Sequence, residues 1–212
     1  MYIPKHFAQG SVEAMHALMA ANPFAMLITL GAEGLCANHI PMELSREPSP
    51  YGTLSGHVAR SNPLWRESSN GAEALVVFQG PNAYITPSWY PSKKETGKVV
   101  PTWNYAVVHA HGQVRMIDDA RWVKAHIGKL THHQEASFAQ PWAVSDAPGE
   151  YTEKMFGGVV GIEILITRLV GKWKVSQNRT AADQAGVVAG LRELGDAEAL
   201  QMAELVERGT GG

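Results

Sequence analysis

Three short runs of this 212-residue chain gather side chains whose types and spacing could do chemistry. The first is residues 55–63 (SGHVARSNP), where a predicted strand ends, small residues turn the chain and a short helix begins. His57, Arg60 and the free amides of the new helix could converge on a phosphate, because helix N-termini attract negative charge. A surface pair of His57 and Arg60 beside an ordinary turn would explain the same residues. The spacing alone leaves both interpretations open.

The second run, residues 172–179 (KWKVSQNR), places several hydrogen-bond donors and acceptors in a small space after a predicted strand. Gln177, Asn178 and Arg179 would suit the edge of a planar polar ligand, or its phosphate. The alternative is a solvated turn in which Trp173 packs into the core. Taken by itself, such a run is more often a turn of that kind than a binding site.

The third run, residues 79–112, is rich in large aromatic side chains and in proline. It holds two of the six Trp, three of the six Tyr, four of the twelve Pro and two of the nine His. Exposing large aromatic side chains forfeits roughly 1.5–3 kcal/mol each, and Pro is confined to strand edges, strand starts and bulges. The run therefore predicts an irregular aromatic wall, in which Trp89, Tyr90 and Lys93 combine stacking surfaces with a cation. A small-molecule site and a subunit interface are both consistent with such a wall.

The histidines and the single cysteine give weaker signals. His109 and His111 are two residues apart on a predicted strand, so they share a face and could bind a metal or a haem iron. No HExxH spacing is present, and a packing role is the favoured interpretation. Cys36 falls inside an apolar strand and is expected to be a small buried side chain rather than a nucleophile. The sequence shows no convincing Ser-His-Asp or Cys-His arrangement and predicts no catalytic residue.

The composition limits the class of protein. A hydrophobic fraction of 45% is ordinary for a chain that buries a core. The net charge of −2 argues against a broad basic surface for nucleic acid, and one cysteine cannot form an intrachain disulfide. We find no signal-peptide pattern and no apolar run that reaches the ~20 residues of a membrane span. A soluble cytoplasmic protein is therefore expected.

The elements that must position these runs are predicted to be mostly strands. Apolar residues repeat at helical spacing over residues 11–21, 119–138, 183–194 and 197–208, and a shorter helix is predicted over 62–69. Trp122, Ile127 and Leu130 are expected on the inner side of the 119–138 helix. Strands are predicted over 24–30, 35–44, 53–58, 72–79, 83–86, 102–116 and 158–175. Short strands at close spacing indicate a mainly β (α+β) fold with an antiparallel barrel, and the tail 209–212 is expected to be disordered.

Six runs together resemble one protein family. They are MYIPKHF, NHIPMEL, GHVARSNPLW, YITPSWYPSK, VPTWNYAVVHAHG and KWKVSQNR, and they occur in that family's order. The family is PaiB, a group of FMN-binding split-barrel proteins described as negative transcriptional regulators, and the resemblance covers residues 1–191. It implies a split β-barrel of the pyridoxamine-phosphate-oxidase type with peripheral and C-terminal helices. It also implies a homodimer with FMN near the subunit interface.

The resemblance also implies roles for individual residues. The phosphate of FMN is expected near His57 and Arg60, with Lys93 adding charge. The flavin ring is expected against the backbone of the second strand, at Asn38, His39, Ile40 and Pro41. Side chains that would close over the ring are Trp89, Tyr90, Gln177, Asn178 and Arg179. The FMN-binding barrel is expected over residues 1–180, with residues 181–212 as a helical extension packed on it.

Several functions are compatible with this interpretation. The first is a flavin-dependent sensor or negative transcriptional regulator. The alternatives are an FMN-dependent oxidoreductase that acts on a small molecule, and a haem-binding split barrel that uses His109 or His111. DNA binding has little support, because the two C-terminal helices contain only Arg192 and Arg208 as cations. The sequence names no substrate.

Overall fold

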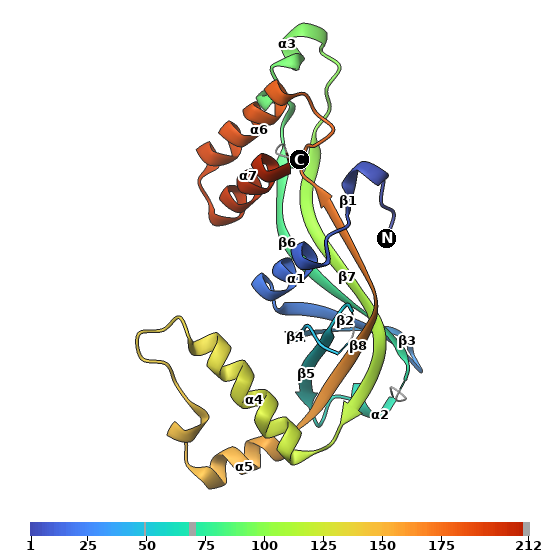
Figure 1. Ribbon diagram of the computed structural model, residues 1–212, viewed down its shortest axis with the longest axis vertical. Coiled ribbons are helices and arrows are strands. Elements are labelled where there is room, and N and C mark those ends of the chain that lie inside the picture. Colours follow the sequence, from blue (N-terminus) through green and yellow to red (C-terminus); the bar gives the residue numbers. More distant parts are fainter. Residues whose placement is uncertain (49, 68–70, 210–212) are drawn as a thin grey trace. The chain divides into compact units, whose positions relative to one another are not determined.

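The computed structural model describes residues 1–48, 50–67 and 71–209. The chain forms two compact units, and each is assembled from separate segments of the sequence (Figure 1). Unit 1 consists of Met1–Ala21, Gln79–Val108 and Val170–Gly212, and unit 2 consists of Asn22–Phe78 and His109–Leu169. The expected boundary at residue 180 stays a prediction. Of the tail 209–212 that was predicted to be disordered, Gly209 is instead the last residue of a helix, and residues 210–212 lie outside the described residues.

Eight strands join in one sheet in the order β3-β2-β6-β7-β8-β5-β4, with β1 paired to β8. They are β1 (Ala8–Gln9), β2 (Phe24–Gly31), β3 (Gly34–Pro41), β4 (Glu43–Ser45), β5 (Thr53–Ala59), β6 (Glu73–Ile85), β7 (Thr102–Ile117) and β8 (Val159–Lys174). The pairs β1–β8, β2–β3, β2–β6, β4–β5 and β5–β8 are antiparallel. The long strands β6, β7 and β8 contribute residues to both units.

One strand prediction is wrong. The segments 72–79 and 83–86 form the single strand β6, because the Gly80-Pro81 pair does not turn the chain. Gly80 instead allows close packing within unit 1: a Cβ there would lie 2.8 Å from Leu18 of helix α1 (Val12–Ala21). A dipeptide that favours turns in isolation is thus kept extended by packing.

The sheet of unit 2 begins with a hairpin formed by the strands predicted over 24–30 and 35–44. Strands β2 and β3 pair from Phe24↔Pro41 to Gly31↔Gly34, and Gly34 takes the left-handed backbone of the turn with φ of +110°. Pro41 lies on an edge strand, as expected. The prediction for Cys36 is wrong: its side chain is exposed, because this part of β3 pairs on one side only. The fully buried core of unit 2 includes Leu27, Leu54, Val76, Ile162 and Ile164.

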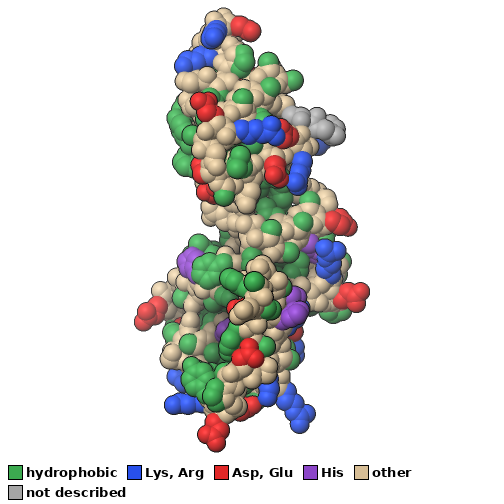
Figure 2. Space-filling view, turned by 90° about the vertical axis from the view of Figure 1, so that its left-hand side faces the viewer, with side chains coloured by type: hydrophobic (Ala, Val, Ile, Leu, Met, Phe, Trp, Pro, Cys, Tyr) green, Lys and Arg blue, Asp and Glu red, His purple; other side chains and the backbone are tan. Residues whose placement is uncertain are grey.

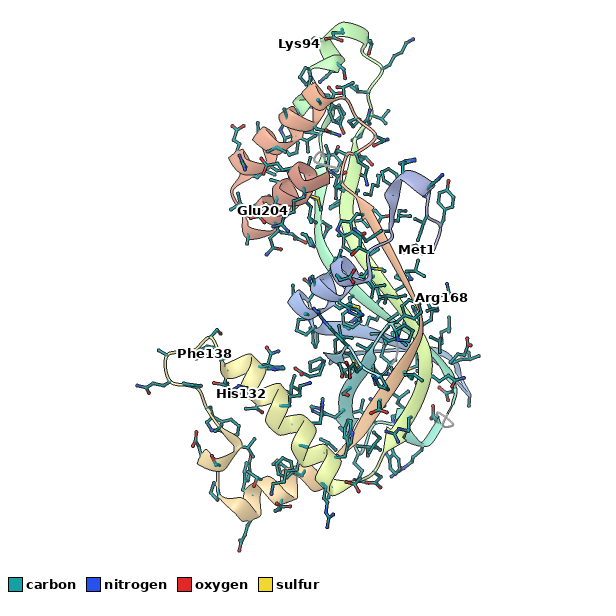
Figure 3. All side chains as sticks on the ribbon, viewed as in Figure 1. Met1, Lys94, His132, Phe138, Arg168 and Glu204 are labelled. Carbon is teal, nitrogen blue, oxygen red and sulfur yellow. The ribbon has the colours of Figure 1, made fainter. Side chains whose placement is uncertain are left out.

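The helices of unit 2 are α2 (Leu64–Glu67), α4 (Ala120–Glu135) and α5 (Gly149–Gly157), with a 3₁₀ turn at Val144–Asp146. Residues 68 and 69 of the helix predicted over 62–69 lie outside the described residues. The side chain of Asp119 accepts a hydrogen bond from the Trp122 amide and caps α4. The inner side of α4 was predicted incompletely: Val123 and His126 are its buried residues, and Trp122 is only half-buried. Phe138, labelled in Figure 3, follows the helix and is 60% exposed.

The helices of unit 1 are α1, α3 (Ser92–Thr96), α6 (Ala181–Leu194) and α7 (Ala197–Gly209), with 3₁₀ turns at Lys5–Phe7 and Pro87–Trp89. Thr180 caps α6 by accepting from the Asp183 amide, and Gly195 ends it with φ of +72°. Helices α6 and α7 lie side by side (Figure 1). They bury an apolar cluster against one face of the strands, made of Ile85, Tyr90, Val175, Val187, Leu191, Met202 and Val206.

Candidate functional site

Arg60 of unit 2 is engaged by the protein itself. Its guanidinium donates to both carboxylate oxygens of Asp118, at 3.0 and 2.5 Å, and its Nε donates to the Gly157 carbonyl at 2.8 Å. A further bond reaches the Val159 carbonyl at 3.3 Å. This pairing lowers the pKa of Asp118 through the hydrogen bond from Arg60. Arg60 therefore ties the end of β5 to the segments around residues 118 and 157–159, and a phosphate would have to compete with Asp118 for it.

His57 is also directed into the protein. Its Nδ1 lies 3.2 Å from Nε2 of His126 on α4, and the His126 ring stacks on Trp122 with centroids 5.1 Å apart. Trp122 in turn lies over Gly161, the β8 partner of His57, where a Cβ would come within 2.2 Å of the indole. Burial lowers the pKa of His57, and burial together with His57 lowers that of His126 to about 4. Both rings are therefore neutral at pH 7, and His57 supplies no positive charge to a phosphate.

The residues predicted on the second strand fall into two groups. Asn38 reaches the turn after β5, where its Oδ1 accepts from Nδ2 of Asn62 at 2.8 Å. Ile40 and Pro41 instead lie close against β5, because a Cβ on Gly56 would come within 3.3 Å of the Pro41 carbonyl oxygen. His39 is exposed on the edge strand. Within unit 2 the structure thus brings Asn38 to the turn after β5, while part of the predicted ring-binding backbone is covered.

Two residues next to the turn after β5, Trp65 and Arg66, were not predicted as site residues. Trp65 donates from Nε1 to the Arg60 carbonyl at 2.7 Å, and the guanidinium carbon of Arg66 lies 4.9 Å from the Trp65 ring centroid. Arg66 is exposed and takes part in no ion pair within the ranges that the structure describes. The free helix amides expected here are fewer than predicted, since Asn62 Oδ1 accepts from the Leu64 amide and α2 has a single turn. The adjacent Trp and Arg of the run SNPLWR could have indicated this aromatic and cationic pair from the sequence.

In unit 1, four of the six predicted side chains are engaged within the unit, and of these Tyr90 is buried while Trp89, Gln177 and Arg179 are partly exposed. Tyr90 is 2% exposed and packs in the α6–α7 cluster, with the Arg179 guanidinium 4.7 Å from its ring centroid. Trp89 lies against Gly190 of α6, where a Cβ would come within 2.2 Å of the indole. Gln177 bonds local backbone, accepting from the Val175 amide at 2.7 Å and donating to the Trp173 carbonyl at 2.6 Å. Asn178 and Lys93 are exposed, and Lys93 reaches Ser88 Oγ at 3.4 Å.

Buried hydrogen bonds centred on Asp183 and Ser176 connect the segments of this unit, and we call them the polar knot. Asp183, 3% exposed, accepts from the amide and the hydroxyl of Ser92, at 3.1 and 2.8 Å. Ser176 adopts a left-handed backbone with φ of 63°, accepts from Asn104 Nδ2 at 2.9 Å through its hydroxyl, and accepts from Gln184 through its carbonyl. Non-glycine residues seldom hold such a backbone without support from the surrounding structure. The motif KVSQNR therefore shapes the chain between β8 and α6.

The opposite face of the same strands carries a second set of aromatic side chains. Strand alternation turns Asn104 and Ala106 inward, and Trp103 and Tyr105 outward. Trp103 and Tyr84 are 55% and 48% exposed, and their rings meet edge to face with centroids 5.9 Å apart.

Two lysines of β8 accompany these rings. Lys172 Nζ lies 5.2 Å from the Tyr105 ring centroid and donates to the Tyr2 carbonyl at 3.2 Å. Lys174 donates to Thr102 Oγ1 and, at 2.8 Å, to the Trp103 carbonyl. We call Tyr84, Trp103, Tyr105, Lys172 and Lys174 the open face of unit 1.

The ammonium of Lys174 is held by neutral oxygens, Thr102 Oγ1 and the Trp103 carbonyl. Among the described residues it forms no ion pair with a carboxylate. Burial, with Lys172 and Arg179 adding to it, lowers the pKa of Lys174, while Tyr105 opposes the shift. The arrangement can therefore accept a flat ring on Trp103 and Tyr84, and an anionic group on Lys174.

The histidines offered as metal or haem ligands lie in unit 2. The His109 and His111 rings have centroids 6.4 Å apart, and burial lowers the pKa of both. Over residues 1–48, 50–67 and 71–209, no three His, Cys, Asp or Glu side chains are placed to hold a metal ion together. No helix in the same ranges is long and apolar enough to cross a membrane.

Residues 1–168 match the family model described as "Putative FMN-binding domain". The protease synthase and sporulation protein PAI 2 of Bacillus subtilis is 32% identical over 98% of this chain and 97% of its own. The chain belongs to the PaiB family of FMN-binding proteins. An uncharacterized protein of Emericella nidulans is 35% identical to this PaiB chain over 99% of it and 98% of the relative.

Solved structures give the fold of this PaiB protein. The FAD and heme binding protein from Mycobacterium smegmatis matches with a TM-score of 0.59 at 16% identity, over 79% of this chain and 73% of its own. The flavocytochrome Anf3 from Azotobacter vinelandii matches with a TM-score of 0.54 at 10% identity, over 81% and 72%. At these identities the likeness establishes the fold alone. The split β-barrel predicted from the sequence is confirmed.

Proposed function

We propose that this PaiB protein is an FMN-dependent sensor or redox protein, and that the open face of unit 1 is its flavin platform. The observation that carries the proposal is the pairing of exposed aromatic rings with an ammonium that no carboxylate of the described residues neutralises, in a chain of an FMN-binding family. FMN presents a flat ring, a polyol and a phosphate, and the open face offers a partner for the first and the last. When bound, FMN would supply one- and two-electron transfer through its ring.

The residues present fit the cofactor in charge and in shape. Trp103 and Tyr84 would support the ring by stacking, since their side chains are half exposed and already held edge to face. Lys174 would hold the phosphate, because its ammonium keeps one N–H beyond the two bonds to Thr102 and Trp103. Lys172, 8% exposed between the Tyr105 and Tyr2 rings, would add positive potential without direct contact.

The roles first assigned to other residues become a weaker alternative. Tyr90, Gln177 and Arg179 already have intramolecular partners, and Arg60 is paired with Asp118. Among the cations near the predicted phosphate position in unit 2, Arg66 is the better candidate because it lacks an ion pair there within the described ranges. The homodimer, with exposed aromatic side chains in its interface, and the cytoplasmic location also stay proposals.

A titration with FMN and with riboflavin tests the platform. We expect the purified protein to be yellow, or to quench FMN fluorescence on titration. Lys174→Ala should weaken FMN binding about tenfold and leave riboflavin, which lacks the phosphate, nearly unchanged. Lys94→Ala, an exposed lysine of α3 (Figure 3), is the matched control. A protein that neither carries nor takes up FMN would refute the proposal, and an equal loss for FMN and riboflavin would remove Lys174 from the phosphate.

Arg60→Ala and Arg66→Ala extend the same titration to unit 2. If the phosphate lies near the turn after β5, one of these variants should lose FMN selectively while Lys174→Ala keeps it. Arg60→Ala should in addition lower the free energy of unfolding, because it leaves the carbonyls of Gly157 and Val159 without their donor. The open-face proposal expects both arginine variants to bind FMN as the parent protein does.

Regulation through direct DNA contact is the second candidate, and it is supported only by the family description. The name of the Bacillus relative refers to protease synthesis and sporulation. In this chain the cations of α6 and α7 are both engaged, Arg192 with Glu207 and Arg208 with Glu204. Basic and acidic side chains are interspersed on the face drawn in Figure 2. A gel shift at low salt, where non-specific binding is strongest, is expected to show no complex; a salt-sensitive complex would favour the DNA-binding regulator.

A further inference from the structure

Unit 2 contains an open groove away from the Arg60 and His57 contacts. Its volume is about 560 Å³, within the range of small-molecule sites. The lining comes from β4, the segment after it, β5, the residue Gly71 just before β6, β7 and β8. It consists of Ser45, Glu47, Pro48, Thr53, Ser55, Gly71, Gln113, Val114, Arg115, Glu163 and Leu165. None of these side chains belongs to the open face of unit 1 or to the predicted FMN residues.

The charges of the groove do not cancel. Arg115 uses Nε and Nη2 on a single oxygen of Glu163, Oε1, at 3.1 and 2.7 Å. The second oxygen of Glu163 has no partner among the described residues, and Glu47 forms no ion pair there. The lining therefore contains two carboxylates and one guanidinium, and that guanidinium is already paired with Glu163. The lining favours a ligand that carries positive charge.

The same lining contains a buried hydroxyl, that of Thr53. Thr53 is 7% exposed, and its Oγ1 has no hydrogen bond within the described residues. Thr53 stands between Ser45 of β4 and Leu165 of β8, and the neighbouring Leu54 points into the core, so the Thr53 side chain lies on the groove side of the sheet. An unpaired buried hydroxyl is costly, and a ligand N–H would satisfy it.

The groove also presents apolar surface. Leu165 is 44% exposed although Ile164 and Ile166 on either side are core residues. Together with Val114 and Pro48, Leu165 forms an apolar surface against which the body of a ligand could pack. We propose that this groove is a second ligand site, for a small organic cation with an amidinium or ammonium head and an apolar body. The head would bind Glu47 and the free oxygen of Glu163, with Thr53 accepting one N–H.

Benzamidine and benzylamine, with benzoate as the anionic counterpart, are the probes for this site. Binding to the full chain is measured by calorimetry, with and without FMN, and backbone amide shifts locate each probe. We expect both cations to bind with Kd in the ~0.1–1 mM range, to shift amides of β5, β7 and β8 around the groove, and to be unaffected by FMN. Benzoate should not bind. No saturable cation binding, or shifts confined to other surfaces, would overturn the proposal.

Substitutions in the lining sharpen the test. Glu47→Gln and Glu163→Gln should each weaken benzamidine about tenfold, and Thr53→Val, which keeps the shape of the side chain, should weaken it severalfold. Glu163→Gln also frees Arg115, so this variant should gain benzoate binding. Glu153→Gln, an exposed carboxylate paired with Lys124 outside the groove, is the matched control and should bind as the parent does. Equal benzamidine affinity in all four variants would refute the site.

Discussion

The two faces of the strands in unit 1 carry similar aromatic side chains and use them differently. Helices α6 and α7 cover one face. There Tyr90 is buried in the apolar cluster and Trp89 packs against glycines of α6, next to the polar knot of Asp183 and Ser176. The other face leaves Tyr84 and Trp103 half exposed beside Lys174. Strand β5 of unit 2 shows a similar contrast along its length, since α4 covers it at His57 and the groove begins at Ser55 and at the buried Thr53. Covered side chains here maintain the fold, and the open ones are those to which we assign ligands in our proposals.

The largest expected effect contrasts two tyrosines. Tyr90→Ala removes a buried ring from the cluster of unit 1 and should lower the free energy of unfolding by about 3–5 kcal/mol. Tyr84→Ala removes a half-exposed ring and should change it by less than about 0.5 kcal/mol. Urea denaturation of both variants measures the difference. Similar losses would mean that the open face is structural as well.

The second contrast concerns how stability depends on pH at the end of β5 that helix α4 covers. The pKa of His126 falls from its usual 6.5 to about 4 in the folded chain, so the neutral ring is the form that stabilises the protein. That stability is complete above pH 6.5 and is lost as the pH falls towards 4, by on the order of 3 kcal/mol. His126→Phe keeps a ring on Trp122 and should flatten the dependence between about pH 7 and pH 4.5. The exposed His132→Ala serves as control, and an unchanged slope in His126→Phe would contradict the assignment.

The third contrast separates binding from stability on the open face. Trp103→Ala should weaken FMN binding about tenfold, or ~1.4 kcal/mol, because it removes a stacking surface. Its unfolding midpoint in urea should stay close to that of the parent. Trp142→Ala, which truncates a 47% exposed tryptophan of unit 2, should leave FMN affinity unchanged. Were both tryptophan variants to lose FMN alike, the platform would have to be sought elsewhere.

The smallest effect concerns a hydroxyl on the covered face. The Tyr90 Oη is buried and forms no hydrogen bond of ordinary geometry among the described residues. Burial is the main cause that raises its pKa, and the neighbouring Arg179 opposes that rise. Tyr90→Phe should therefore change the free energy of unfolding by less than about 1 kcal/mol, in either direction. A much larger loss on thermal denaturation would reveal a partner for this hydroxyl.

Much of the fold could be predicted because its signals are local. The hairpin of β2 and β3, the Asp119 cap and the spacing of α6 and α7 follow from turn residues and apolar repeats in short windows. The family could be predicted from six runs in a fixed order. Gly80-Pro81 was misleading because packing against Leu18, far away in the sequence, keeps the strand extended.

The site was harder to predict because exposure depends on which face a helix covers. Trp89 and Trp103 have the same chemistry, and composition cannot tell which of them α6 will bury. The carboxylate that occupies Arg60 is Asp118, 58 positions further along the chain, so no local pattern reveals it. Neither Arg66 nor Lys174 was predicted as a site residue. Arg66 lies just after the run 55–63, and Lys174 lies inside the run 172–179, where the polar residues 177–179 offered more hydrogen-bonding groups.

The pairing of β1 with β8 has a consequence for how the protein is made. Ala8 is the partner of Lys172, and Lys172 also binds the carbonyl of Tyr2, 170 positions away in the chain. During synthesis, Tyr2 and Ala8 cannot form these bonds until β8 has left the ribosome. Contacts of such long sequence separation slow folding, and they leave early segments exposed meanwhile. Unit 1 can thus be completed only after β8 has been synthesised, although helix α1 is made well before it.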